Sequence, residues 1–375
     1  MNSRLDNLVS WLAAAAVVTA GVVIALWHEQ EQAKRPRPAR VLPRASPAQE
    51  PLELQRSRAG ERGRGRRARA PLQIPWRGWK DITSRVLREI QDDRIMLVAA
   101  GVTFYSLLSL FPAIGAGVSC YALVSDASTI AKHLSLAAGV VPAEVLDMLR
   151  DAITRIASKS DNRLTFGFLL GVGVALWSAN AGVKAIFDAL NIIYDETEQR
   201  GFVRLNLESL LFTLCSIAAA LLAVGAVVAF PLLTAALGRP TLDQPTLDIL
   251  RWPVLLVLAI AGLAVLYRYG PSRRPAKWRW ISVGSIFAGA AWLAVSSLFS
   301  WYLGNFANYD ATYGTLGAVI GLMMWMWLST LVVLVGAEIN SEIEHQTARD
   351  STIGTEKPLG ARGAVMADTV GAARF

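Results

Sequence analysis

The segment "TLGAVIGLMMWMWLSTLVVLVG", Thr315 to Gly336, has 22 residues and no charged side chain. A helix of about 20 predominantly apolar residues is long enough to cross the hydrocarbon core of a bilayer. Lipid offers no water to the backbone N–H and C=O groups, so such a segment must satisfy them internally. The stretch therefore predicts a membrane-spanning α-helix.

Six further stretches have the same character, and the whole chain is apolar. Of its 375 residues 53% are hydrophobic and only 18% are charged, and the mean hydropathy is +0.38. These values are outside the range of ordinary soluble domains. They predict an all-α, polytopic transmembrane helical bundle with six core spans and one extra N-terminal span. The other spans are Leu8–Trp27, Ile95–Val124, Leu164–Ala181, Leu207–Ala236, Ile249–Tyr267 and Trp280–Leu303.

The composition divides the chain into four parts. Residues 1–27 form an N-terminal transmembrane anchor, for which a cleavable signal peptide is the alternative. Residues 28–74 are rich in Arg, Pro and Gly and poor in aromatic side chains, which predicts a basic, disordered linker that the core does not need for folding. Residues 75–346 form the six-helix membrane domain, and residues 347–375 are expected to be a disordered cytoplasmic tail.

The membrane domain begins with "PWRGWKDITSRVLREI", an amphipathic segment. Trp76, Trp79, Ile82, Val86 and Ile90 lie near one helical face, with Arg and Lys on the other. This pattern predicts a helix lying in the membrane surface with its indole rings at the headgroups.

Basic residues in the loops predict the orientation. Residues 28–94 contain 17 Lys and Arg, and the loop Arg268–Arg279 contains five and no acid. Both should face the cytoplasm, and so should the C-terminus. The formal net charge of +8 then favours anionic lipid headgroups as partners, above all at the basic linker, and does not indicate nucleic-acid binding.

A second amphipathic segment, "AGVKAIFDALNIIYDETEQR" from Ala181 to Arg200, continues a span at its cytoplasmic end. Its polar face carries Lys184, Asp188 and Asn191. One interpretation is an interfacial helix with a solvated polar face. The other is a polar face that turns inward and lines a path for an ion or a headgroup.

The end of the last span carries a matching polar face. Glu338, Ser341, Glu342 and His345 recur at helical spacing just after Gly336. We expect this face to meet Lys184, Asp188 and Asn191 in a polar gate or headgroup site. We also expect a cation beside Glu338, supplied by Lys184, Arg200 or Arg204. Solvated helix ends whose charges contribute almost nothing are the alternative.

Small residues predict where helices approach closely. Gly167 and Gly171, and likewise Gly317 and Gly321, have the GxxxG spacing that allows two membrane helices to pack backbone against backbone.

The sequence contains no recognisable catalytic or metal-binding motif. Its three histidines, His28, His133 and His345, are far apart, and neither Cys120 nor Cys215 has metal-ligand spacing around it. The HExxH, phosphate-loop and GxSxG patterns are all absent from the sequence. We therefore expect no enzyme, no metal and no cofactor.

Three motifs in order resemble the YihY/BrkB family of bacterial inner-membrane proteins. They are "QDDRIMLVAAGVTFYSLLSLFPAI" (Gln91–Ile114), "WSANAGVKAIFDALNIIYDETEQR" (Trp177–Arg200) and "YGTLGAVIGLMMWMWLSTLVVLVGAEINSEIEH" (Tyr313–His345). The resemblance implies six core spans with both ends of the core in the cytoplasm, and it makes the leading span and its linker an addition. It also brings a historical ribonuclease label, which the scattered histidines argue against.

These patterns favour a translocator of lipid or small solute in the cell envelope. A non-catalytic membrane scaffold or assembly factor that binds anionic lipid or a partner protein is the alternative. A membrane enzyme is the weakest hypothesis, and the sequence leaves an oligomer possible without indicating its size.

Overall fold

The structure is a computed structural model, and it describes residue 47 and residues 50–122, 164–236, 244–306 and 316–373. The predicted anchor at residues 1–27, the linker up to residue 46 and the segment 123–163 lie outside the described residues. The description below concerns the compact unit that begins at Pro47.

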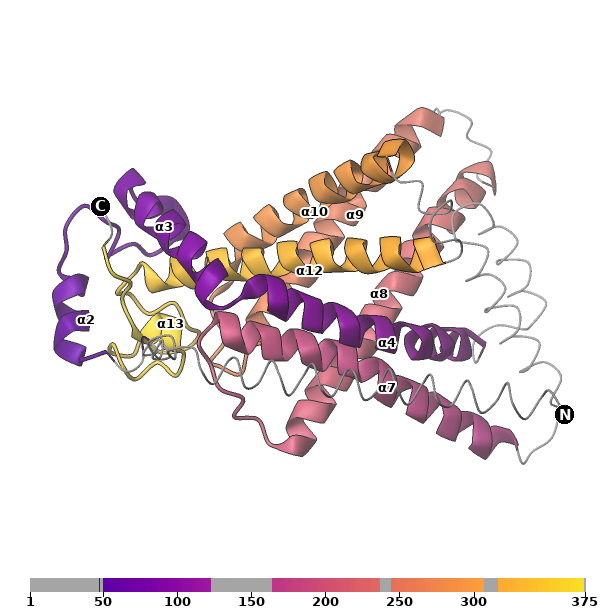
Figure 1. Cartoon of the computed structure of the whole chain (residues 1–375), viewed down its shortest axis with the longest axis horizontal. Coiled ribbons are helices and arrows are strands. Elements are labelled where there is room, and N and C mark those ends of the chain that lie inside the picture. The colour runs from indigo at the N-terminus through magenta and orange to yellow at the C-terminus, as the bar shows by residue number, and fades with distance from the viewer. Residues whose placement is uncertain (1–46, 48–49, 123–163, 237–243, 307–315, 374–375) are drawn as a thin grey trace, which may run out of the picture. The chain divides into compact units, whose positions relative to one another are not determined.

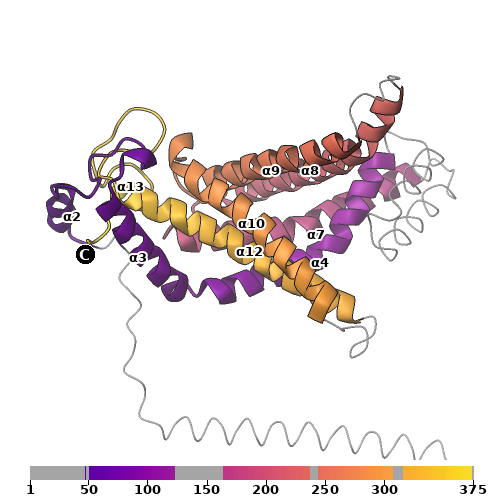
Figure 2. The same ribbon diagram turned by 90° about the horizontal axis from the view of Figure 1, so that it is seen from above.

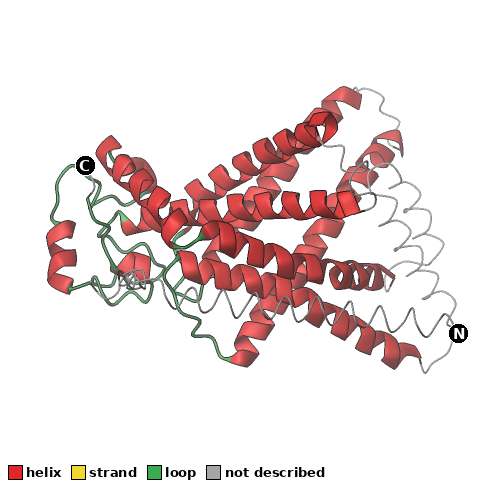
Figure 3. Ribbon diagram, viewed as in Figure 1, coloured by secondary structure: helices red, strands yellow, loops and turns green. Residues whose placement is uncertain are grey.

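The described residues form helices joined by loops, with no strand among them (Figure 3). The expected all-α class is therefore confirmed for this part of the chain. The long helices are α3 (Trp76–Asp92), α4 (Ile95–Ala122), α7 (Leu164–Ile193), α8 (Phe202–Ala236), α9 (Gln244–Tyr269), α10 (Trp278–Phe306) and α12 (Leu316–His345). The short ones are α2 (Leu52–Ala59), the 3-10 turn η2 (Pro71–Gln73) and α13 (Val365–Asp368).

Three described helices are long and apolar enough to cross a membrane, and a bent pair would make four. The three segments are Phe202–Leu221, Trp278–Asn305 and Val319–His345. The count of six core spans plus one N-terminal span stays a prediction.

The bent pair is α3 followed by the segment Ile95–Leu110 of α4, and the two meet at 59°. Arg94 interrupts the helix with φ of 50°, a conformation that a non-glycine residue rarely adopts. The helix predicted from Trp76 onward is present, but its protein-facing side includes charged residues: Asp81 and Arg85 are buried together with Ile82, whereas Trp76 is exposed. It packs on α12, so one side of the predicted surface helix belongs to the protein core.

Helix α12 is the centre of the packing. It contacts α3, α4, α7 and α10, and α10 in turn packs on α9 (Figures 1 and 2). Helices α10 and α12 approach each other closely at two glycines, because a Cβ on Gly284 would lie 2.0 Å from the carbonyl oxygen of Gly336. Asn340 fixes this contact, because its amide oxygen accepts the N–H of Gly284 at 2.7 Å and its amide nitrogen donates to Ile281 O at 3.1 Å.

The glycine pairs expected from the sequence are less informative. A Cβ on Gly321 would have no described atom within 4 Å, so the described residues show no close helix contact there. Gly167 and Gly171 lie in α7, but their surroundings are outside the described side chains. Packing at both pairs stays a prediction, and the observed close approach uses Gly284 and Gly336.

Both segments flanking the membrane domain are ordered where the structure describes them, at residues 50–74 and 347–373. Helices α2 and α13 lie at the end of the molecule where α12 ends (Figures 1 and 2). Arg66, Thr347 and Arg362 are buried. The expected disorder of these residues is therefore wrong. The composition was misleading because buried arginines here bind backbone carbonyls, so a segment poor in aromatic residues is held by hydrogen bonds.

Candidate functional site

The polar end of α12 is enclosed by other parts of the chain. Every residue from Gly336 to Thr347 is buried except Ile339, which is partly buried. Charged side chains are mostly exposed and are almost never fully buried unless they are paired. The enclosed charged residues and their arginine partners form what we name the α12 cap, consisting of Arg85, Arg273, Glu338, Glu342 and Glu344.

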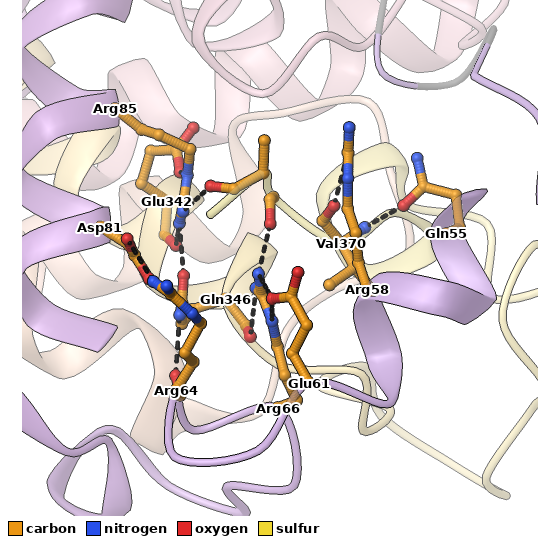
Figure 4. Close-up of polar contacts among 12 residues, drawn as sticks. Gln55, Arg58, Glu61, Arg64, Arg66, Asp81, Arg85, Glu342, Gln346 and Val370 are labelled. Atoms are coloured by element: carbon orange, nitrogen blue, oxygen red, sulfur yellow. Dashed lines mark hydrogen bonds and ion pairs between the residues drawn. The ribbon is translucent and has the colours of Figure 1, made fainter. Parts of the chain in front are cut away.

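The first pair of the α12 cap joins α3 to α12 (Figure 4). The Arg85 guanidinium forms a buried ion pair with Glu342 and also donates to the side chain of Gln346 at 2.7 Å and to Ala372 O at 3.1 Å. His345 Nδ1 lies 3.5 Å from the other carboxylate oxygen of Glu342. Glu342 is therefore a structural anion in this fold, with both oxygens in use.

The second pair joins the α9–α10 loop to α12. Arg273 donates to Glu344 at 2.7 Å with both side chains fully buried. Ser351 donates to the other oxygen of Glu344 at 2.5 Å, and the Arg273 guanidinium lies 4.1 Å from the centre of the Tyr194 ring. Removing one partner of such a pair would leave an uncompensated buried charge.

Arginines of residues 50–74 complete the enclosure (Figure 4). Arg66 donates to Gln346 O at 3.2 Å and to Gly371 O at 2.6 Å, and it pairs with Glu61 at 2.7 Å. Arg58 donates to Val370 O at 3.0 Å. The two segments that flank the membrane domain are thus tied to each other and to the end of α12.

Glu338 has no such partner. It is 0% exposed, and neither carboxylate oxygen has a hydrogen-bond partner among the described residues. The charged groups that influence it most are all acids, Glu342, Asp93, Glu89 and Asp195. The expected cation beside Glu338 is therefore not found in the described part of the chain.

The three candidate cations bind elsewhere. Lys184 donates to Asn206 on α8 at 2.5 Å and lies over the Trp177 ring. Arg200 pairs with Glu198 at 2.7 Å and Glu208 at 3.0 Å, and Arg204 shares Glu208 at 2.7 Å. The sequence places these cations at the correct end of the bundle, but α8 begins beside them and supplies nearer acceptors.

The other predicted gate residues also have local roles. Asn191 accepts the N–H of Ser272 at 2.7 Å and donates to Glu198 at 3.1 Å, so it joins the end of α7 to the α9–α10 loop. Asp188 is exposed. A gate built from these residues stays a prediction.

Two glutamates after α7 have very different pKa values because their surroundings differ. Hydrogen bonds from Arg200 hold the pKa of Glu198 at about 2, against the opposing effect of burial. Burial raises the pKa of Glu196 to about 7, although the N–H of Val365 and the Arg273 guanidinium act in the opposite direction. Glu196 therefore changes charge near neutral pH.

Glu196 lines a pocket of about 1070 Å³, which we name the arginine pocket. Its polar wall comes from Glu50 and Gln55, residues 196–208 before and at the start of α8, the α9–α10 loop and the segment 360–369, and its apolar wall from α8 and α9. The basic residues in the wall are Arg200, Arg204, Arg268, Arg273 and Arg274, and the apolar wall includes Leu211, Phe212, Cys215 and Val265.

The pocket was not found by reasoning on the sequence. The basic run Arg268–Arg279 was interpreted only as a topological signal, although five basic residues with no acid were also a signal for an anion site. Among the described residues, no group of three or more His, Cys, Asp and Glu side chains could hold a metal ion.

Comparison with known proteins identifies the family. A family model described as "Virulence factor BrkB" matches residues 86–359. The chain is 30% identical over 261 residues to the "Putative ribonuclease-like protein YfkH" of Bacillus subtilis strain 168, covering 65% of this chain and 88% of that protein. It is 26% identical over 282 residues to UPF0761 membrane protein IL2447 of Idiomarina loihiensis, covering 72% and 95% of the two chains.

A further relative is longer than the shared region. UPF0761 membrane protein Bxeno_A3061 of Paraburkholderia xenovorans is 24% identical over 257 residues, which cover 67% of this chain and 57% of that one. No solved structure matches the chain. The match of the family model to well over half of the sequence shows that this chain belongs to the YihY/BrkB family of membrane proteins.

Proposed function

We propose that this membrane protein is a translocator of lipid or small solute in the cell envelope, located in the bacterial inner membrane with its C-terminus in the cytoplasm. The observation that carries the proposal is the arginine pocket, which joins a charged wall to an apolar wall in one space of about 1070 Å³. A molecule with a polar and an apolar part needs both kinds of wall.

The position of the pocket supports the same function. Leu211 and Cys215 belong to the apolar segment Phe202–Leu221, which is long enough to cross a membrane. The charged wall is at the beginning of that segment, where Arg204 and Glu208 lie. An amphiphile could therefore place its polar group among the arginines and its apolar part along α8.

Reconstitution tests the proposal. Purified full-length protein in liposomes should accelerate the movement of a fluorescent phospholipid between leaflets, or the flux of a small solute, above the rate of protein-free liposomes. An unrelated helical membrane protein reconstituted at the same density is the control. Rates equal to that control for a panel of lipids and solutes would refute translocation.

A scaffold or assembly factor that binds anionic lipid or a partner protein is the second candidate. It is favoured by the exposed arginines of the ordered segment 50–74, at positions 56, 62, 67 and 69. Such a cluster attracts anionic headgroups by about 1 kcal/mol per basic residue. Binding of the protein to acidic vesicles without any transport would support this candidate over the first.

A further inference from the structure

Three arginines that line the arginine pocket carry buried guanidinium nitrogens with no hydrogen-bond partner among the described residues. Arg268 has no partner for Nε and Nη1, Arg273 none for Nε and Nη2, and Arg274 none for Nη1 among the described residues. A buried donor left without an acceptor costs about 1–3 kcal/mol. Three neighbouring arginines with this property in one pocket wall indicate a site built for an acceptor.

Contacts that leave these nitrogens unused hold two of the three guanidinium groups in place. Arg268 lies 4.2 Å from the centre of the Trp278 ring and is 8% exposed. Arg273 is fixed by its ion pair with Glu344. Rigid, preorganised donors bind an anion with less loss of side-chain entropy than flexible surface lysines do.

The acids of the same pocket are already engaged. Glu208 accepts from Arg200 and Arg204, and Glu50 accepts from Arg58 and Gln55. Asp368 accepts the backbone N–H groups of Arg362 and Gly363, and Glu196 accepts the backbone N–H of Val365. The negative charges therefore face other donors, and the unsatisfied donors belong to the arginines of the α9–α10 loop and the end of α9.

A phosphate group fits this donor set. Its oxygens accept several N–H bonds at once, and the planar guanidinium is the side chain whose geometry matches them. The apolar wall formed by Leu211, Phe212, Cys215 and Val265 adjoins the arginines. A free phosphate ion would leave that wall exposed to water, whereas the acyl chains of a lipid would cover it.

We infer that Arg268, Arg273 and Arg274 form a binding site for the phosphate group of an anionic phospholipid, whose acyl chains lie along the apolar wall of α8 and α9. This inference rests on the proposed function in that it names the substrate class of the same pocket. Binding is nevertheless measurable without transport.

Native mass spectrometry of the full chain in detergent tests the site. The ligands are phosphatidylglycerol, diacylglycerol with the same acyl chains, and inorganic phosphate as competitor. Phosphatidylglycerol should bind at least about tenfold more tightly than diacylglycerol, because a charge-assisted hydrogen bond contributes a factor of this size. Arg274→Gln and Arg268→Gln should each weaken phosphatidylglycerol binding by about tenfold.

Arg279→Gln is the matched control, because Arg279 is exposed near the same loop and does not line the pocket. Circular dichroism and the thermal midpoint of each variant establish that it is folded. Arg273→Gln is left out because it would also break the buried pair with Glu344.

Three results would overturn the inference: equal affinity for diacylglycerol and phosphatidylglycerol, folded Arg268→Gln and Arg274→Gln variants that bind like the wild type, and displacement of the lipid by millimolar inorganic phosphate. The last would make the site one for the free ion. Headgroup-selective binding without lipid movement in liposomes would support this binding site and refute translocation. Transport that survives both arginine substitutions would support translocation and refute this binding site.

Discussion

The charged side chains of α12 differ mainly in whether they form an ion pair. Glu342 and Glu344 each have a buried arginine, whereas Glu338 on the same helix has none among the described residues. A buried ion pair is weak evidence for net stabilisation, but loss of one member is costly because the other is left charged and unpaired. This asymmetry makes the α12 cap testable one residue at a time.

The first prediction concerns Arg85 and Glu342. Arg85→Gln should lower the free energy of unfolding by about 3–5 kcal/mol, since it leaves Glu342 buried without its cation. The double change Arg85→Gln, Glu342→Gln should recover part of this loss. Thermal unfolding of the detergent-solubilised protein measures both. Arg88→Gln is the control because Arg88 is exposed on the same helix, and an Arg85→Gln midpoint equal to that of Arg88→Gln would contradict the structure.

The second prediction concerns pH. The pKa of Glu196 is raised from 4.5 to about 7 in the folded protein. Its contribution to stability is complete below pH 4.5 and is lost as the pH rises through 7, because the unfolded chain then releases the proton more readily. With allowance for solvent screening, we expect a loss of about 1–2 kcal/mol between pH 5 and pH 8.

Glu196→Gln should abolish this part of the pH dependence, as measured by unfolding midpoints at the two pH values. Glu53→Gln, on the exposed face of α2, should keep the wild-type dependence. Identical slopes for the wild type and Glu196→Gln would show that Glu196 does not titrate in this range.

At the scale of helices, contact between α10 and α12 depends on two glycines. A Cβ on Gly284 would meet Gly336 O at 2.0 Å, and a Cβ on Gly336 would meet the Tyr267 hydroxyl at 2.7 Å. The Tyr267 hydroxyl is held in this position because it donates a hydrogen bond to Val333 O at 2.7 Å. Three helices, α9, α10 and α12, are therefore positioned by one small patch of backbone contact.

We accordingly predict that Gly284→Ala forces α10 and α12 apart and lowers stability by at least about 1–3 kcal/mol, the usual cost of overpacking. Gly321→Ala, which has no described atom near its Cβ, should change stability little. Unfolding of the two single variants under identical conditions makes the comparison. Equal destabilisation by both changes would support the close helix contact at Gly317 and Gly321 that their spacing predicts.

For the whole molecule, residues 50–74 and 347–373 act as one structure around the helix ends. Arg66 contacts Gln346, 280 positions away in the chain, and Gly371, 305 positions away. The C-terminal segment in turn donates Gly371 N–H to His345 O at 2.8 Å. A change in the N-terminal segment should therefore loosen the C-terminal one.

Arg66→Gln tests this connection. The substitution removes the two hydrogen bonds from the guanidinium to backbone carbonyls and the ion pair with Glu61. Limited proteolysis should therefore cut the segment 347–373 faster in the variant than in the wild type. The exposed neighbour provides the control, and Arg67→Gln should be cut at the wild-type rate. Unchanged proteolysis of Arg66→Gln would mean that the two segments are stable independently.

The orientation of the whole molecule is the last prediction. Reporter fusions within the loop Arg268–Arg279 and after residue 345 should both report from the cytoplasm, because the basic residues of short loops are retained on that side. The two sites must agree, since α10 and α12 are the helices that separate them. A report from opposite sides would disprove the alternation of spans.

The helical class and the positions of most helices follow from the local pattern of apolar residues. The runs behind α4, α8, α10 and α12 begin within five residues of their predicted starts, because the need for an uninterrupted apolar segment is local. The continuation of α7 through Asn191 is local too, since it follows from helical periodicity.

The pairing of charged side chains, in contrast, depends on how the helices pack. Lys184 and Glu338 are on helices that pack together, yet Lys184 binds Asn206 and Glu338 binds no described residue. The arginine-rich segment 50–74 is ordered for the same reason: its acceptors are carbonyl groups of residues 346, 370 and 371. Composition and periodicity describe neighbours along a helix, whereas these partners lie on different elements. Lys184 and Asn206 are 22 positions apart, the arginines of segment 50–74 and their acceptors are 280 to 312 positions apart, and all of them meet only when the helices have packed.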